Sequence, residues 1–173
     1  MVEKFERVDK NVNFKKELGK GKECEQHFYD YFTARGHHCY FIDEKDVDFI
    51  VTTKKGRQLK VDVKRGANFG QYDYCRQRML VEDIQNIRIG SDGWFRYDAD
   101  DLYICLDDII NKKFYLYQMG DLREYIAEYK GYTSYVLYGE LQNSLCYFVY
   151  IEKFFDWLLR HGRSHHVFSY GEK

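Results

Sequence analysis

The feature that most constrains this chain is a pair of short apolar runs, at residues 47–52 and 58–64, separated by a basic turn that contains a glycine. In each run apolar and polar residues alternate, which is the period of a β-strand with one buried face. We expect a three-residue hairpin loop at residues 54–56, with the glycine in the left-handed conformation. The resulting antiparallel register places every apolar residue opposite another one, including Phe49 opposite Val61.

The same register places Asp48 directly opposite Asp62, on the face of the hairpin that does not bury. Like charges at directly opposed positions are destabilising, because their β-carbons lie only about 5 Å apart. A hard divalent cation with oxygen ligands offsets this repulsion, and so does Lys64, which shares the face of Asp62 two residues further on. The alternative is a solvated strand face balanced by an ion pair between Asp46 and Lys64.

Residues 21–36 predict a helix, because apolar side chains recur there at helical spacing before the stop at Gly36. Glu25 lies at the border of the apolar stripe, where an acid points toward the sheet on which the helix packs. Glu23 is the weaker alternative for that position. Residues 39–42 then predict a strand that leads into the hairpin.

Residues 20–65 predict four elements in a row. They are a helix with an acid, a strand, a strand with Asp, and a strand with Asp-x-Lys. In this order of elements the chain resembles the PD-(D/E)XK nuclease superfamily, and within it the Holliday-junction-resolvase and restriction-endonuclease-like branch of phages and bacteria. The chain departs from the pattern in having no proline before Asp48 and Asp in place of the more frequent Glu at position 62. The motif assigns four site residues: Glu25, Asp48, Asp62 and Lys64.

The resemblance implies an α/β fold, with a restriction-endonuclease-like mixed central β-sheet flanked by α-helices. It also implies a divalent-metal-dependent endonuclease that hydrolyses phosphodiester bonds of duplex or branched DNA. Mg²⁺ or Mn²⁺ would be held by Asp48, Asp62, the backbone carbonyl of Val63 and, through water, Glu25. Lys64 would orient the attacking water or neutralise charge that develops on the phosphate.

Three other classes of function stay open. The first is a nuclease-fold protein that has lost catalysis and only binds DNA. The second is a protein-interaction module, such as a phage-encoded inhibitor of a host defence, which the near-neutral charge and the 17 tyrosines would suit. The third is a nuclease that acts on RNA.

The formal net charge of −1 is the main argument against a nucleic-acid enzyme, because such proteins are usually basic. The distribution of the charges weakens this argument. Basic residues outnumber acidic ones in residues 1–90, and the reverse holds in residues 91–173. Basic side chains also flank the expected site, where they would contact phosphates without reading sequence. These candidate nucleic-acid contacts are Lys20, Lys22, Lys54, Lys55, Arg57, Arg65, Arg76 and Arg78.

The length of 173 residues suits one domain, which we expect over residues 1–160, followed by a flexible tail at 161–173. No apolar run has the length of a membrane span, and the first residues do not resemble a signal peptide. Five cysteines without C-x-x-C spacing predict reduced thiols. We therefore expect a cytoplasmic protein with no membrane partner.

Strands at 102–106 and 114–117 are expected to complete a central sheet of about five strands, followed by a helix with Asp121 as its N-cap. The segment 91–103 resembles one that follows the nuclease core in small phage and bacterial members of the superfamily. Its Trp94 is expected to turn in toward the core.

Two more strands are expected at 134–137 and 145–150, before a C-terminal amphipathic helix at 151–160. If the apolar stripe of this last helix stays exposed in the monomer, it is the natural surface for a homodimer.

Overall fold

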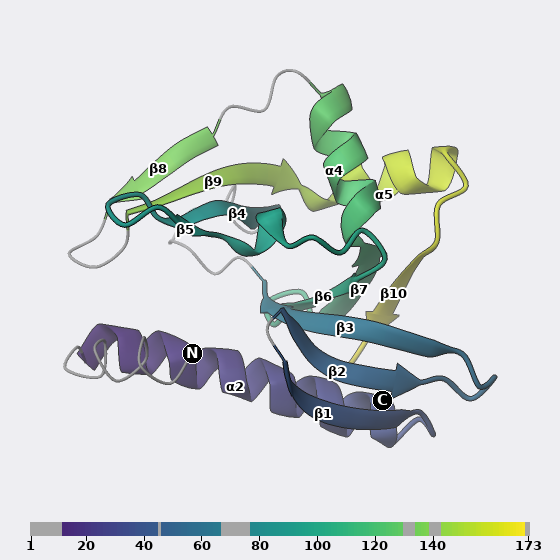
Figure 1. Cartoon of the computed structure of the whole chain (residues 1–173). Coiled ribbons are helices and arrows are strands. Elements are labelled where there is room, and N and C mark those ends of the chain that lie inside the picture. The colour runs from purple at the N-terminus through teal and green to yellow at the C-terminus, as the bar shows by residue number, and fades with distance from the viewer. Residues whose placement is uncertain (1–11, 45, 67–76, 130–133, 139–142, 172–173) are drawn as a thin grey trace.

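The structure is a computed structural model that describes residues 12–44, 46–66, 77–129, 134–138 and 143–171. For residues 12–20, 43, 134–138 and 143 it describes the backbone alone. Within these limits the chain forms a mixed α/β fold of two sheets and several helices (Figure 1). The α/β class expected from the sequence is therefore confirmed.

The larger sheet is mixed and has six strands in the order β1-β2-β3-β6-β7-β10. Strands β3 and β6 pair in parallel, and every other neighbouring pair in this sheet is antiparallel. Its strands are β1 (His38–Glu44), β2 (Val47–Thr52), β3 (Gln58–Arg65), β6 (Tyr103–Asp108), β7 (Lys113–Gln118) and β10 (His165–Ser169).

The smaller sheet is antiparallel and has the order β5-β4-β9-β8. Its strands are β4 (Arg78–Asn86), β5 (Ser91–Asp92), β8 (Ser134–Tyr138) and β9 (Asn143–Tyr150). The described helices are α2 (Val12–Thr33), the 3-10 turn η1 (Trp94–Arg96), α4 (Met119–Glu128) and α5 (Ile151–Arg160).

The predicted hairpin is present, and the four pairs next to its turn have the expected register, whereas the predicted pairs Val47–Val63 and Asp48–Asp62 are not part of the ladder. The turn closes through the Thr53 N–H, which donates to the Arg57 carbonyl at 2.8 Å, and Gly56 has the expected positive φ of 80°. The confirmed pairs are Phe49–Val61, Ile50–Lys60, Val51–Leu59 and Thr52–Gln58.

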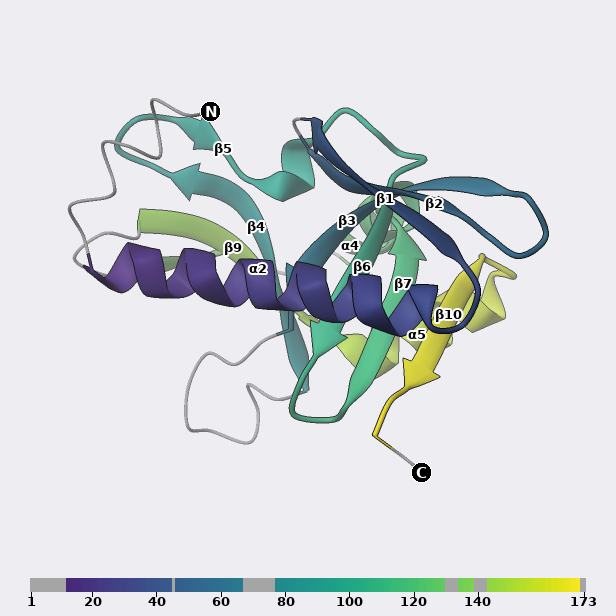
Figure 2. The same ribbon diagram turned by 90° about the horizontal axis from the view of Figure 1, so that it is seen from below.

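Helix α2 covers one face of the larger sheet, and Figure 2 shows it lying across the strands. Its apolar stripe is buried as predicted, with Phe28 packed against Phe32, Phe49 and Phe114 at ring-centroid distances of 4.5, 5.1 and 6.3 Å. The helix starts at Val12, well before the expected start at residue 21.

The opposite face of the larger sheet packs against the smaller sheet and helices α4 and α5, which gives the fold three layers (Figure 1). Alternation along β6 explains the division, because Cys105 belongs to the core under α2 whereas Ile104 and Leu106 belong to the second core. Strand β7 divides in the same way, with Phe114 and Leu116 in the core under α2 and Tyr117 in the second core.

Helix α5 has the predicted bounds, but its apolar stripe does not form a free surface. Phe154, Trp157 and Leu158 are each at most 2% exposed, because they pack under the smaller sheet and α4. The stripe is therefore core and not a dimer interface. Helix α4 begins at Met119 with Gln118 as its N-cap, so Asp121 lies in the first turn and is not the cap.

A flexible tail was expected at residues 161–173, but His165–Ser169 form the edge strand β10, which pairs with β7. The strand is fastened by contacts to distant parts of the chain. Phe168 packs on Phe32 at 5.2 Å, and the Tyr170 hydroxyl donates to the buried carboxylate of Asp107 at 2.5 Å. The same carboxylate lies 2.8 Å from Nδ1 of His27 on α2.

Candidate active site

The candidate site lies where strands β2 and β3 stop pairing. The ladder ends at Phe49 and Val61, so Asp48 and Asp62 are not a ladder pair as the sequence predicted. Instead, the Val63 backbone N–H donates to Asp48 Oδ2 at 2.7 Å. The carboxylate of Asp48 thus takes the place of a backbone acceptor and reaches across to β3.

Asp62 and Lys64 lie together on the face of β3 that points away from α2. The Lys64 Nζ lies 2.7 Å from Asp62 Oδ2. Asp62 is only 3% exposed, whereas the Lys64 side chain keeps 25% of its surface accessible. Val61 and Val63 point to the opposite face and pack under α2, as strand alternation requires.

The electrostatics of the cluster reflect a buried acid beside a second acid and one cation. Burial raises the pKa of Asp62 to about 7, with Lys64 opposing the rise and Asp48 adding to it. Desolvation lowers the pKa of Lys64, but the attraction of Asp62, joined by Tyr97 and Asp48, outweighs it and raises the pKa above its usual value. Lys64 therefore stays charged near neutral pH, where Asp62 exchanges its proton.

Glu25 on α2 belongs to the same electrostatic cluster. Burial raises the pKa of Glu25, the negative charge of Asp48 adds to the rise, and Lys22 and Lys64 oppose it. Glu25 is partly buried, whereas the alternative acid Glu23 is exposed. Asp48, Asp62 and Lys64 therefore lie together, and Glu25 lies within electrostatic reach of Asp48 and Lys64.

The raised pKa of Asp62 makes stability depend on pH. An acid whose folded-state pKa lies near 7 instead of 3.8 binds its proton more tightly in the folded state, so its contribution is complete below pH 4 and is lost as the pH rises through 7. The free energy of unfolding should therefore fall across this window, by at most about 1.4 kcal/mol per pH unit. Asp62→Asn should remove this fall, which urea denaturation in EDTA at several pH values measures.

The exposed Asp98 supplies the control for that experiment. Asp98→Asn should keep the pH dependence of the wild type. An unchanged dependence in Asp62→Asn would show that Asp62 does not titrate in this window.

Three residues that the sequence did not assign to the site lie near Lys64, on the side of the smaller sheet. The Lys64 Nζ lies 5.9 Å from the ring centroid of Trp94 and 5.6 Å from that of Tyr97. Burial raises the pKa of Glu82 on β4, and the charge of Lys64 opposes the rise. The only signal in the sequence was the segment 91–103, whose Trp94 is buried as expected.

The basic candidates fall into different groups. Lys22 on α2 and the hairpin-turn residues Lys54, Lys55 and Arg57 are exposed. Arg78 instead lies over the Tyr150 ring at 4.2 Å and donates to its hydroxyl, so its guanidinium is engaged inside the protein. Arg65 is partly buried on the face of β3 opposite to Asp62. It lies near Cys24 of α2, because burial raises the pKa of that thiol and the charge of Arg65 opposes the rise. The Lys20 side chain and Arg76 lie outside the described residues.

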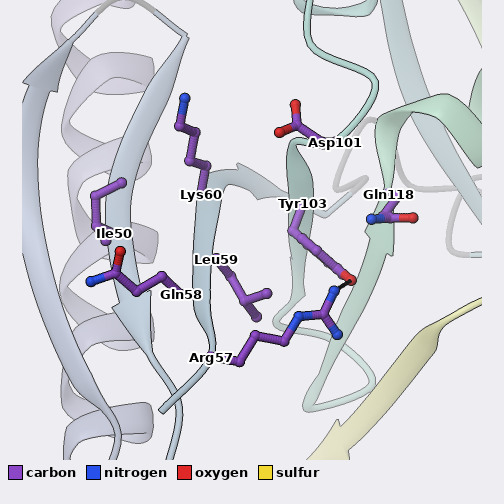
Figure 3. Close-up of a pocket in the computed structure, with 8 residues that line it drawn as sticks. All are labelled: Ile50, Arg57, Gln58, Leu59, Lys60, Asp101, Tyr103 and Gln118. Carbon is purple, nitrogen blue, oxygen red and sulfur yellow. Dashed lines mark hydrogen bonds between the residues drawn. The ribbon is translucent and has the colours of Figure 1, made fainter.

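A shallow pocket of about 260 Å³ lies beside the hairpin turn, further along β3 from the cluster (Figure 3). Arg57 lines it and donates to the Tyr103 hydroxyl at 3.1 Å, and Lys60 extends along another side. Lys60 shares the strand face of Asp62 and Lys64, because it precedes them by two and four residues. A continuous row of side chains thus joins the exposed basic turn to the cluster.

The donor set of the cluster suits Mg²⁺ or Mn²⁺ as a partial ligand set. Asp48 and Asp62 offer hard oxygens on neighbouring strands, close enough for Asp48 to raise the pKa of Asp62. Among the residues that the structure describes, no group of three or more His, Cys, Asp or Glu side chains is placed to hold a metal ion. Mg²⁺ commonly needs only one or two carboxylates, because waters and substrate phosphates complete its shell.

Comparison with known proteins finds no matching family model, no similar curated protein and no similar solved structure. Among the described helices, none has the combination of length and apolar character that crossing a membrane requires. The functional assignment therefore depends on the geometry of the site.

Proposed function

We propose that this protein is a divalent-metal-dependent endonuclease that hydrolyses phosphodiester bonds of DNA, built on a restriction-endonuclease-like fold. The observation that carries the proposal is the convergence of Asp48, Asp62 and Lys64 where β2 and β3 separate. The order of elements supports it as well, because α2, β1, β2 and β3 follow one another as in the PD-(D/E)XK pattern.

Asp48 and Asp62 would hold the metal, together with the Val63 carbonyl and, through water, Glu25. When bound, Mg²⁺ or Mn²⁺ supplies Lewis acidity at the scissile phosphate and acidifies a water molecule. The hydrogen bond from the Val63 N–H fixes Asp48 Oδ2, so this carboxylate is oriented before the metal arrives. Asp62 gives up its proton to bind a cation, which couples metal binding to pH near 7.

Lys64 would stabilise the negative charge that develops on the phosphate oxygens, or orient the attacking water. A fixed cation in a poorly solvated site is most effective where charge develops. The Lys64 side chain keeps a quarter of its surface accessible, so a substrate phosphate could approach it. The exposed Lys54, Lys55 and Arg57 would contact the phosphate backbone away from the cut.

A DNA-binding protein of the same fold without catalysis is the second candidate. Two observations favour it: the lysine already neutralises Asp62 at 2.7 Å, and the described residues contain no complete protein-only metal cage. In that case the protein would bind DNA equally well with Mg²⁺ or with EDTA, and would not cut it.

Cleavage assays on labelled duplex, junction and single-stranded DNA, each with Mg²⁺, Mn²⁺ or EDTA, test the proposal. We expect cutting of at least one DNA substrate with metal, no cutting in EDTA, and recovery when metal is restored. A structured RNA in the same series separates a ribonuclease from a deoxyribonuclease. Binding without cutting under every condition would overturn the proposal in favour of the second candidate.

A further inference from the structure

The segment from Asp92 to Asp100 has no part in the proposed chemistry, yet it is fastened on both sides and carries two aromatic rings to Lys64. Trp94 is 8% exposed and Tyr97 is partly buried. Their ring centroids lie 5.9 and 5.6 Å from the Lys64 Nζ, within the range of cation–π attraction. The segment therefore connects the smaller sheet to the proposed catalytic lysine.

Strand β4 holds the segment on one side. The Gly93 N–H donates to the Asp83 carbonyl at 2.9 Å, and a β-carbon at Gly93 would collide with the backbone of Glu82. Arg96 grips the Asp83 carboxylate through two nitrogens, at 2.8 and 3.1 Å. A bidentate pair of this kind fixes orientation as well as distance.

Helix α4 holds the other side through Arg123. Its guanidinium donates to the Phe95 carbonyl at 3.0 Å, to the Tyr97 carbonyl, and to the Asp100 carboxylate. Arg123 thus binds the backbone on either side of Arg96 and fixes the position from which the Tyr97 ring projects. Bonds from two separate elements leave this short segment little freedom.

We propose that Trp94 and Tyr97 are positioning residues that hold the Lys64 ammonium against Asp62, and so set its place in the cleavage site. This inference rests on the proposed function. A lysine side chain has four rotatable bonds, and the ion pair with Asp62 restrains it from one direction only. The two rings restrain it from the side of the smaller sheet, and part of the side chain stays accessible.

The rings act through Lys64 and not on substrate, so their loss should lower kcat and leave KM nearly unchanged. Loss of one cation–π contact of this type is expected to reduce kcat about tenfold, which corresponds to about 1.4 kcal/mol of transition-state stabilisation. Tyr97→Leu removes the ring, whereas Tyr97→Phe keeps it and removes only the hydroxyl. The conservative variant should therefore retain the activity of the wild type within about twofold.

A second measurement, on the Lys64 side chain itself, does not depend on cleavage. In ¹³C-labelled full-length protein, aromatic ring currents should move the Hε resonances of Lys64 upfield of those of exposed lysines. Lys64→Met assigns these resonances by their absence. They should stay in place in Tyr97→Phe and move toward the exposed-lysine positions in Tyr97→Leu and in Trp94→Leu.

Each outcome of these measurements bears on the positioning role. Unchanged Lys64 resonances in both leucine variants would overturn it, and so would a Tyr97→Phe variant that loses as much activity as Tyr97→Leu. If the wild type cuts no nucleic acid, the proposed function fails, and the Lys64 resonances alone then decide whether the rings hold the lysine.

Discussion

Lys64→Met should reduce the rate of DNA cleavage about 100- to 1000-fold, which is the usual loss when one preorganised group at a developing charge is removed. Methionine keeps an unbranched apolar stem of similar length, so packing beneath Trp94 and Tyr97 is largely retained. The buried Asp62 left behind can stay protonated, because its pKa already lies near 7. The variant should therefore fold, bind DNA and fail to cut, as single-turnover cleavage assays would show.

Lys60→Met is the matched control for that variant. Lys60 is exposed, lies on the same strand and shares the face of Lys64, but it is four residues away. Its loss should weaken DNA binding, with a smaller salt dependence, and leave the rate of the bound complex within about threefold of the wild type. Equal rates for Lys64→Met and the wild type would remove Lys64 from the chemistry.

Phe28→Ala should lower the free energy of unfolding by about 4 kcal/mol, which is typical for truncation of a fully buried phenylalanine. Phe28 is 1% exposed and joins α2 to both β2 and β7 through its contacts with Phe49 and Phe114. The cavity would weaken the contact of α2 with the sheet, so Glu25 should also be held less firmly. Urea denaturation measures the loss of stability.

Tyr29→Ala provides a control at the next position of the same helix. Tyr29 is 41% exposed, so its truncation should cost less than about 1 kcal/mol. Similar losses for the two variants would contradict the packing of α2 on the larger sheet.

The sequence predicted best what is decided by neighbouring residues. The hairpin register follows from alternation and from one glycine in the turn, so Phe49–Val61 and Val51–Leu59 pair as expected. The buried stripe of α2 and the bounds of α5 follow from helical periodicity in the same way. The four motif residues are carried by α2 and the two hairpin strands, which are elements of this local kind.

The pairing of Asp48 with Asp62 was predicted less well, because alternation does not show where a ladder ends. The strands separate after Phe49, and a side-chain acceptor replaces the backbone one. The two carboxylates still meet, but through Asp48 reaching across to Val63.

Long-range pairing accounts for what the sequence did not predict. Strand β10 is short and polar in part, and its stability comes from β7, Phe32 and Asp107, which are distant in the chain. Trp94, Tyr97 and Glu82 likewise lie near Lys64 because of the second sheet, in which β4 pairs with β9. A local pattern contains no information about such contacts.

The binding of Mn²⁺, measured by titration calorimetry in two buffers of different ionisation enthalpy at pH 7, tests the central claim most directly. The claim is that Asp48 and Asp62 form an ion site beside Lys64. Wild-type protein should bind Mn²⁺ with release of protons, because Asp62 is partly protonated at this pH. Asp62→Asn should bind at least about tenfold more weakly and release fewer protons, whereas Lys54→Ala should match the wild type. Equal Mn²⁺ affinity in Asp62→Asn and the wild type, or no binding by either, would contradict the claim.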